Sequence, residues 1–323
     1  MRFLNVLLAV SLLFATAACS MEDDMLTVSA VATSEANDDN TQLYVSFNVS
    51  DNAVATRASS SENAGEQGDV IASASLIVFE GNQVYFAQDG IKDFSAVKVL
   101  FQTNRSYVVY VIDNAATAFS AMKTKEAVDA AVLNADDMNN NVKFGQASVS
   151  YAKGQGYATI AEAKAAAAET ATIEVKQLTA KVELKEYTIK VQNGTNASSV
   201  KLEKVELVNQ SVERTLNAVT GSKFETAEAT PATEGTIASF STFPNENGQT
   251  AMRLTIKVGD NTVVKEYVIN PNGLKVDHNY VRAGHIYQLY VTATVNGDNV
   301  DCAVKCCTLD WDYNSFEVSV VEL

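Results

Sequence analysis

Short apolar–polar alternations, separated by polar turns, run along most of this chain of 323 residues. Such alternation places the apolar side chains on one face of a strand, and strands at this spacing indicate antiparallel β-sandwiches. Residues 106–112 are β-branched and aromatic throughout, which predicts a central strand buried on both faces. Hairpin turns are expected at 81–82, 260–261 and 296–299. The sequence therefore predicts a mainly β fold with a few short helices.

The strand pattern falls into two halves, which predict two β-sandwich domains. Residues 115–135 contain helix formers with apolar residues at helical spacing, so a helix is expected there. The alanine-rich stretch 158–171 has helix propensity but almost no large apolar residue, and we place the domain boundary near its end. The expected domains are 58–172 and 173–323. Strands are expected at 69–80, 83–86, 97–101, 106–112, 172–191, 201–208, 251–258, 262–269, 286–295 and 300–309.

The first 19 residues predict export from the cytoplasm. Arg2 is followed by an apolar run of about a dozen residues, which is too short for a stable membrane-spanning helix and is typical of a secretory signal. Residues 16–19 end in Cys19 and have the pattern of a lipobox, in which the thiol receives a lipid. Cys19 is thus the predicted lipidation site. The alternative is an ordinary signal peptide that contains a cysteine.

Residues 20–57 are expected to be a leader that is removed by proteolysis. No Lys or Arg occurs between residues 20 and 56, and Arg57 precedes Ala58 and a stretch of small polar residues. An isolated arginine in an exposed segment is accessible to an Arg-specific protease. The alternative is an ordinary surface arginine in a linker. The leader contains a strand pattern whose apolar face comprises Leu43, Val45, Phe47 and Val49.

Cleavage after Arg57 would remove a strand that has an apolar face and therefore needs a core. The sheet left behind would be an acceptor for another strand, as in donor-strand addition. The C-terminal residues 312–323 are a candidate donor, because Phe316, Val318 and Val320 alternate with polar residues. The alternative is an ordinary last strand paired within its own domain, and the alternation alone does not separate the two.

Composition excludes several classes of function. The net charge is −15 with no basic block, so the chain is a poor ligand for nucleic acid. Only two histidines occur, His278 and His285, and neither has a Ser or Asp partner at catalytic spacing. We therefore expect no enzyme, no catalytic residue, no cofactor and no metal. A glycan contact by the aromatic residues of 310–313 is the alternative to packing of the single Trp at a core or interface.

Three cysteines lie close together near the C-terminus. In a strand, Cys302 and Cys306 share a face about 13 Å apart, too far for a disulfide, and Cys307 points the opposite way. Their spacing does not suit zinc. Buried free thiols are the prediction, and an intermolecular disulfide remains open.

Several motifs in order along the chain resemble the Bacteroidales major fimbrial subunits, the FimA-type fimbrillins of type V pili. The resemblance covers most of the chain. The motifs that carry it are the lipobox at Cys19, the cleavage-like site at 56–58, YVVYVIDN at 107–114, QLTAKV at 177–182, VELVN at 205–209, TFPNEN at 242–247, RAGHIY at 282–287 and Trp311.

The resemblance implies two transthyretin-like sandwich domains and a structural role in a surface fimbria that supports adhesion. It implies export as a lipoprotein whose precursor is anchored at the outer membrane through Cys19, and removal of the leader and its strand by an Arg-specific protease. It also implies polymerisation with copies of the chain or related subunits. A donor strand, commonly C-terminal, would fill the groove of the next subunit. A stalk subunit is the first interpretation. A lipid-retaining anchor, a tip subunit and a surface glycan-binding lipoprotein are the alternatives, and host or bacterial surface ligands remain open.

Overall fold

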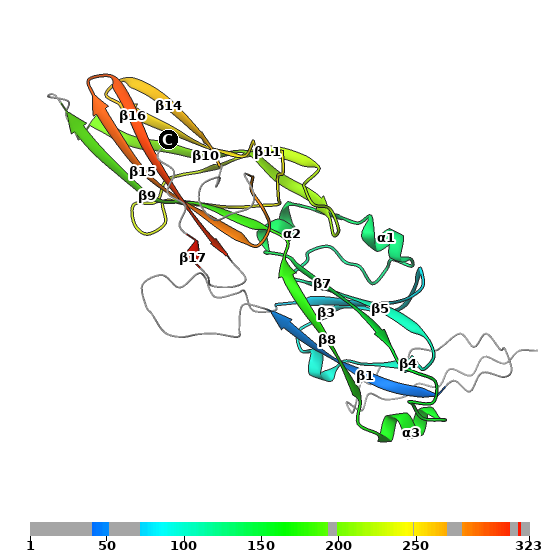
Figure 1. The fold of residues 1–323 in the computed structure, drawn as a ribbon. Coiled ribbons are helices and arrows are strands. Elements are labelled where there is room, and N and C mark those ends of the chain that lie inside the picture. The colour runs from blue at the N-terminus through cyan, green and yellow to red at the C-terminus, as the bar shows by residue number, and fades with distance from the viewer. Residues whose placement is uncertain are drawn as a thin grey trace, which may run out of the picture.

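The computed structural model describes residues 41–51, 72–192, 199–247, 249–269, 280–310 and 316–317. Strands account for most of them, and they form two β lobes placed end to end along the long axis of the molecule (Figure 1). The helices among these residues are short: α1 Lys125–Asp129, α2 Ala135–Asn139, α3 Ile160–Ala165 and the 3-10 turn η2 Phe94–Ala96. The expected mainly β fold with a few short helices is confirmed.

The first domain is built on a seven-stranded path in the order β3-β2-β5-β7-β8-β1-β4. The path curls so that its ends approach each other, and the Tyr85 hydroxyl on β3 donates a hydrogen bond of 2.6 Å to the Leu100 carbonyl on β4. Apolar side chains from most of these strands fill one enclosed core. The strands are β1 Gln42–Asp51, β2 Ala74–Glu80, β3 Gln83–Ile91, β4 Lys98–Gln102, β5 Ser106–Asp113, β7 Lys143–Ser150 and β8 Glu169–Gln177.

The second domain is a sandwich of two five-stranded sheets. One has the order β11-β10-β13-β14, with the short β6 added to β10, and the other has the order β12-β9-β15-β16-β17. Their inner faces enclose a second apolar core. The strands are β6 Val132–Leu133, β9 Ala180–Gln192, β10 Val200–Thr215, β11 Lys223–Ala229, β12 Ala238–Thr242, β13 Ala251–Val258, β14 Asn261–Val268, β15 His285–Asn296, β16 Asn299–Asp310 and β17 Phe316–Glu317.

A third apolar cluster joins the two domains. It combines Tyr110 and Phe119 of the first domain with Leu216 and Phe243 of the second, all of them buried. Backbone pairing reinforces the junction, because β6, which lies between β5 and β7 in the chain, pairs with β10. Side-chain burial and strand pairing therefore both connect the two lobes.

The expected strands and turns of the second half agree closely with the structure. Strand β13 has the expected bounds, and the tight turns at 259–260 and 297–298 join β13 to β14 and β15 to β16. In the first half, the turn at 81–82 joins β2 to β3. Strand β5 is buried on both faces, as its composition predicts, with Val109, Tyr110, Val111 and Ile112 at most 1% exposed.

The prediction of a helix over 115–135 is wrong. That segment forms turns, the five-residue helix α1 and the strand β6. Asn114 starts it with a φ of 59°, and the buried Asp137 carboxylate accepts hydrogen bonds from the backbone N–H groups of Ala116 and Thr117. These side-chain interactions hold the backbone in a loop, while Phe119 still reaches the interdomain cluster.

The alanine-rich stretch forms the short helix α3 and the start of β8. Strand β8 pairs with β1 and β7, and its Ile173 and Val175 point into the first core. The boundary that we expect at 172/173 therefore falls inside β8, because the alternation of Ala171, Ile173 and Val175 continues the first sheet. The single alternating stretch expected at 172–191 is two strands, β8 and β9, separated at residues 178–179.

Candidate functional site

The leader strand pattern forms β1, which lies inside the first domain rather than at its edge. Strand β1 pairs in antiparallel register with β4, from Gln42 opposite Gln102 to Ser46 opposite Lys98. On its other side it pairs in parallel with β8, from Val45 opposite Glu169 to Asp51 opposite Val175. Figure 1 shows β1, in blue, between these two neighbours. The N-terminal part of the chain thus supplies an integral strand of the sheet.

The predicted apolar face of β1 points into the first core. Leu43, Val45 and Phe47 are 3%, 0% and 4% exposed, and Val49 packs against the same cluster. The Phe47 ring meets the Phe101 ring of β4 edge to face, with centroids 6.4 Å apart. Tyr44, on the opposite face, is buried as well. The structure therefore brings the four predicted residues together on one face.

An aromatic cluster forms the wall of the core beside β1. The Phe101 ring stacks on the Tyr107 ring of β5 with their centroids 4.4 Å apart. The centroids of the Tyr85 and Tyr107 rings are 5.1 Å apart. Burial raises the pKa of both tyrosine hydroxyls, and the neighbouring Tyr107 raises that of Tyr85 further. The Tyr107 hydroxyl accepts a hydrogen bond from the Gln102 N–H, which opposes the rise of its own pKa but does not outweigh burial. The cluster is therefore neutral over the physiological range and offers a rigid apolar surface to β1.

Polar groups fix β1 along its length. The Ser46 hydroxyl donates to the Glu169 carbonyl at 3.0 Å and lies 3.2 Å from the Thr170 hydroxyl of β8. At the start of the strand, Thr103 donates to the Thr41 carbonyl from its backbone N–H at 2.8 Å and from its hydroxyl at 3.0 Å. Sequence reasoning missed Thr41, Ser46 and Thr103, because single hydroxyl residues carry no local signal of a long-range partner.

Of the C-terminal candidate donor, 312–323, the structure describes only residues 316–317. Strand β17 comprises Phe316 and Glu317, which pair with Leu309 and Thr308 of β16. Val318 and Val320 lie outside the described residues, as do Cys19, Arg57 and Ala58. Leu309 and Ile286 form a small apolar cluster of their own on this sheet. The expectation that residues 312–323 act as a donor strand stays a prediction.

The cysteines lie on β16 as free thiols. Cys306 is buried in the second core with Cys302 packed against that core, so the two share a face as predicted. Cys307 is buried too. Burial raises the pKa of all three thiols, that of Cys306 to about 12, so they are weakly nucleophilic. Within the described ranges, no group of three or more His, Cys, Asp or Glu residues has the geometry of a metal site.

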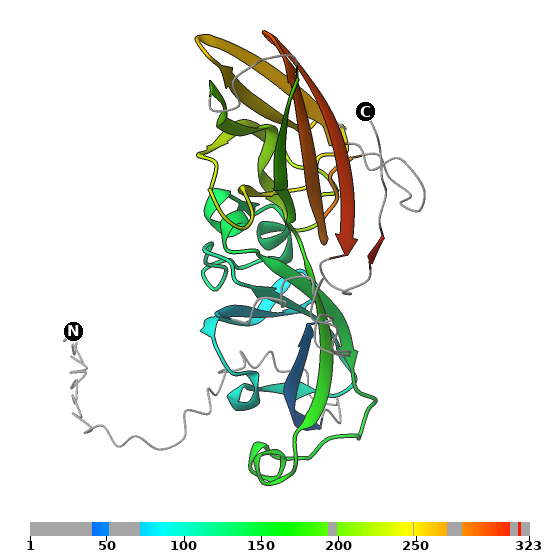
Figure 2. The ribbon, with the colours of Figure 1, turned by 90° about the vertical axis from the view of Figure 1, so that its left-hand side faces the viewer.

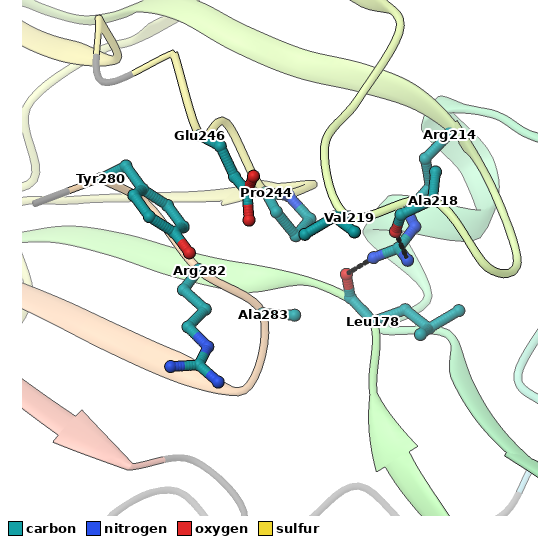
Figure 3. Close-up of a pocket in the computed structure, with 9 residues that line it drawn as sticks. All are labelled: Leu178, Arg214, Ala218, Val219, Pro244, Glu246, Tyr280, Arg282 and Ala283. Atoms are coloured by element: carbon teal, nitrogen blue, oxygen red, sulfur yellow. Dashed lines mark hydrogen bonds between the residues drawn. The ribbon is translucent and has the colours of Figure 1, made fainter. Parts of the chain in front are cut away.

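A pocket of about 460 Å³ lies at the junction of the domains, lined among others by Arg214, Glu246 and Arg282 (Figure 3). Burial lowers the pKa of the Arg214 guanidinium to about 10. This group donates hydrogen bonds to backbone carbonyls of Leu178, Thr215, Leu216 and Ala218. Figure 3 shows the Arg282 side chain extending away from Arg214, so the two arginines do not converge on one anion. Arg214 is a structural connection between β10 and the segment that joins the domains.

No helix among the described residues has the length and hydropathy needed to cross a membrane.

The fold that these sheets define is that of the fimbrial and cell-adhesion proteins of Bacteroidales. The structure superposes on a fimbrilin (FimA) from Porphyromonas gingivalis with a TM-score of 0.60 and 12% identity, over 88% of this chain and 100% of that one. A candidate cell-adhesion protein from Parabacteroides distasonis gives a TM-score of 0.55 and 13% identity, over 84% and 97% of the chains. The tip fimbrial protein Mfa3 from Porphyromonas gingivalis gives a TM-score of 0.50 and 14% identity, over 84% of this chain and 100% of that one.

The sequence itself matches no protein-family model and no curated protein. The likeness to fimbrial subunits inferred from scattered motifs is therefore confirmed at the level of the fold. These matches cover 84–88% of this chain and nearly all of each neighbour, so the similarity includes both domains.

Proposed function

We propose that this protein is a structural subunit, first of all a stalk subunit, of a surface fimbria that supports adhesion. The subunit polymerises by strand exchange: an Arg-specific protease cuts after Arg57, β1 leaves the first domain, and a strand of another subunit takes its place. The partners are copies of this chain or related fimbrial subunits. The similarity in fold to fimbrilin and to a tip fimbrial protein supports this role.

The observation that carries the proposal is the place of β1 between β4 and β8. Its buried apolar side chains contribute on the order of 6–12 kcal/mol before entropy. A whole domain is commonly stable by about 5–15 kcal/mol, so a chain that has lost β1 strongly favours a replacement strand. A replacement that pairs with both neighbours would dissociate slowly, which suits a filament.

The remaining steps of the proposal concern the precursor. Cys19 receives a lipid after export and holds the precursor at the outer membrane, and cleavage after Arg57 releases the mature chain, which begins at Ala58, from that anchor. The strand that fills the vacated position comes from residues 312–323, with Phe316, Val318 and Val320 facing the core of the acceptor.

The mature N-terminus tests the stalk role. Mass spectrometry of filaments sheared from the cell surface should find chains that begin at Ala58. Chains that retain lipidated Cys19 would contradict the stalk role and identify the lipid-retaining anchor. A chain that stays monomeric and is captured on polysaccharide would instead identify the glycan-binding lipoprotein.

Substitution of the candidate donor tests its identity. Phe316→Asp or Val318→Asp should abolish filaments while the monomer still folds, because a charge would enter an apolar core. Ser319→Asp, on the alternate face, is the matched control and should polymerise. Normal filaments from Phe316→Asp and Val318→Asp would show that another segment is the donor.

A further inference from the structure

The segment 151–168, which connects β7 to β8, lies against the beginning of β1. Its helix α3 contacts β1. Gln42 and Tyr157 form an antiparallel bridge, in which the Gln42 N–H donates to the Tyr157 carbonyl at 2.8 Å and the Tyr157 N–H donates to the Gln42 carbonyl at 2.7 Å. The beginning of β1 is therefore held by a third stretch of backbone in addition to the strands β4 and β8.

Gly156 allows this close approach. A Cβ atom at this position would lie 2.6 Å from the Gln42 carbonyl oxygen and 2.9 Å from its nitrogen. Real Cβ contacts are essentially never shorter than 3.0 Å, so no other residue fits while β1 is present. The φ of Gly156 is outside the left-handed region, so its backbone conformation is open to other residues. The glycine is therefore required by the neighbouring strand and not by its own turn.

The segment contacts the main chain of β1 and the Thr41 hydroxyl. The Gly156 N–H donates to the Thr41 hydroxyl at 3.0 Å, and that hydroxyl lies 2.9 Å from the Thr103 hydroxyl. The side-chain oxygen of Gln42 is buried without a hydrogen-bond partner in the described structure. Contacts to the backbone depend little on the sequence of the strand, so another strand in the same register would satisfy them equally.

Apart from β1, the main anchor of the segment is its first residue: Tyr151 packs against the first core, and its carbonyl accepts a hydrogen bond of 2.7 Å from the Asn104 N–H. Beyond Tyr151, little other than β1 holds the segment in place. Ala163 is the only buried residue of α3, and Tyr157 and Ile160 are 42% and 48% exposed. A helix of six residues has negligible stability on its own, even with the capping box that Thr159 and Glu162 form here. The order of the segment beyond Tyr151 therefore depends on the strand beside it.

We propose that residues 151–168 form a clamp that closes on the main chain of whichever strand occupies the position of β1. The inference rests on the strand exchange proposed above and adds the element that locks the exchanged strand. The clamp is closed in the precursor, opens when β1 leaves, and closes again on the donor strand of a second subunit. Its contact groups are the backbone of Gly156 and Tyr157.

Cleavage by a Lys-specific protease reports whether the clamp is open or closed and leaves the bond after Arg57 intact. Lys153 and Lys164 lie in the clamp and are exposed, but cleavage requires the local chain to unfold. A Lys-specific protease should cut after these residues at least about ten times faster in the mature chain than in the unlipidated precursor 20–323. A synthetic peptide of residues 41–51, added to the mature chain, should restore protection. Equal cutting rates in the precursor and the mature chain would overturn the proposal.

The substitution Gly156→Val tests the contribution of the clamp apart from that of the rest of the groove. The mature variant should keep the thermal stability of the mature wild type, because the clash arises only with an occupied groove. Its affinity for the 41–51 peptide should fall at least about tenfold, since the hydrogen bonds to Thr41 and Gln42 are lost. Ala158→Val, at an exposed neighbouring position, is the matched control and should bind normally. Unchanged affinity of Gly156→Val would contradict the clamp.

The 41–51 peptide keeps this test distinct from that of the proposed function. If the C-terminal segment is not the donor, filaments fail or use another strand, but the peptide still closes the clamp. If strand exchange itself is wrong, the mature chain neither polymerises nor binds the peptide. If only the clamp is wrong, the peptide binds and cutting at Lys153 and Lys164 stays unchanged.

Discussion

At the scale of single residues, hydrogen-bonded carboxylates, the partly buried Asp89 and the buried Asp137, organise the loops that replace the expected helix. Asp89 of β3 accepts hydrogen bonds from the Ser75 hydroxyl at 2.6 Å and from the Ser120 and Phe119 N–H groups at 3.0 and 3.3 Å. Burial alone would raise the pKa of this carboxyl, but the hydrogen bonds outweigh burial and lower it. Asp89 thus links the edge of the first sheet to the loop that carries Phe119 into the interdomain cluster.

The lowered pKa of Asp89 makes part of the stability depend on pH. An unfolded aspartate has a pKa of about 3.9, so the stabilisation is complete above that pH and is lost as the pH falls through the lower folded value. Asp89→Asn should lower the free energy of unfolding by about 1 kcal/mol at pH 7 and flatten its fall toward about pH 3. Urea unfolding at a series of pH values measures the free energy of unfolding and its dependence on pH. Asp298→Asn, in an exposed turn, is the control. Parallel curves for Asp89→Asn and wild type would contradict the assignment.

At the scale of elements, the sequence predicts strands well where alternation and turn signals coincide. The hairpins β13–β14 and β15–β16 are examples, because each is local and closes on a tight turn. The prediction of a helix over 115–135 is wrong because two features outweigh the helix propensity of the segment. The Asp137 carboxylate accepts a hydrogen bond from the distant Ala116 N–H, and Asn114 has a positive φ. The apolar face of β1 was predictable, but its parallel partner β8 and the clamp around Gly156 were not, because both depend on contacts more than 100 residues apart.

Strand β1 should act as a separable element. The mature chain, which lacks it, should unfold at lower urea concentration than the precursor, and the peptide 41–51 should restore most of the difference. Val45→Asp in the peptide should weaken binding at least about a hundredfold, because Val45 is fully buried in the core. Asn48→Asp, at an exposed position of the same strand, is the control and should bind nearly as wild type. Equal unfolding midpoints of the precursor and the mature chain would show that β1 adds no stability.

At the scale of the whole molecule, the acceptor position and the candidate donor belong to different domains. Strand β1 lies in the first domain, while the C-terminal strand β17 begins on β16 of the second (Figure 2). Repeated head-to-tail contacts of this kind give an open fibre when they do not close into a ring. A filament built this way transmits force through both domains of every subunit, so the junction between them has to be firm. The interdomain cluster, the β6–β10 pair and Arg214 are the contacts that connect the two domains at this junction.

The junction should make the two domains unfold as one unit. We expect a single calorimetric transition for the precursor, because Phe243 of the second domain is fully buried in the interdomain cluster. Phe243→Ala should cost about 3–5 kcal/mol and split the transition in two, since the cavity it leaves lies between the domains. Phe240→Ala removes the same side chain from the interior of the second domain and should lower stability while the transition stays single. Two transitions in the wild type, or one transition in Phe243→Ala, would show that the cluster does not couple the domains.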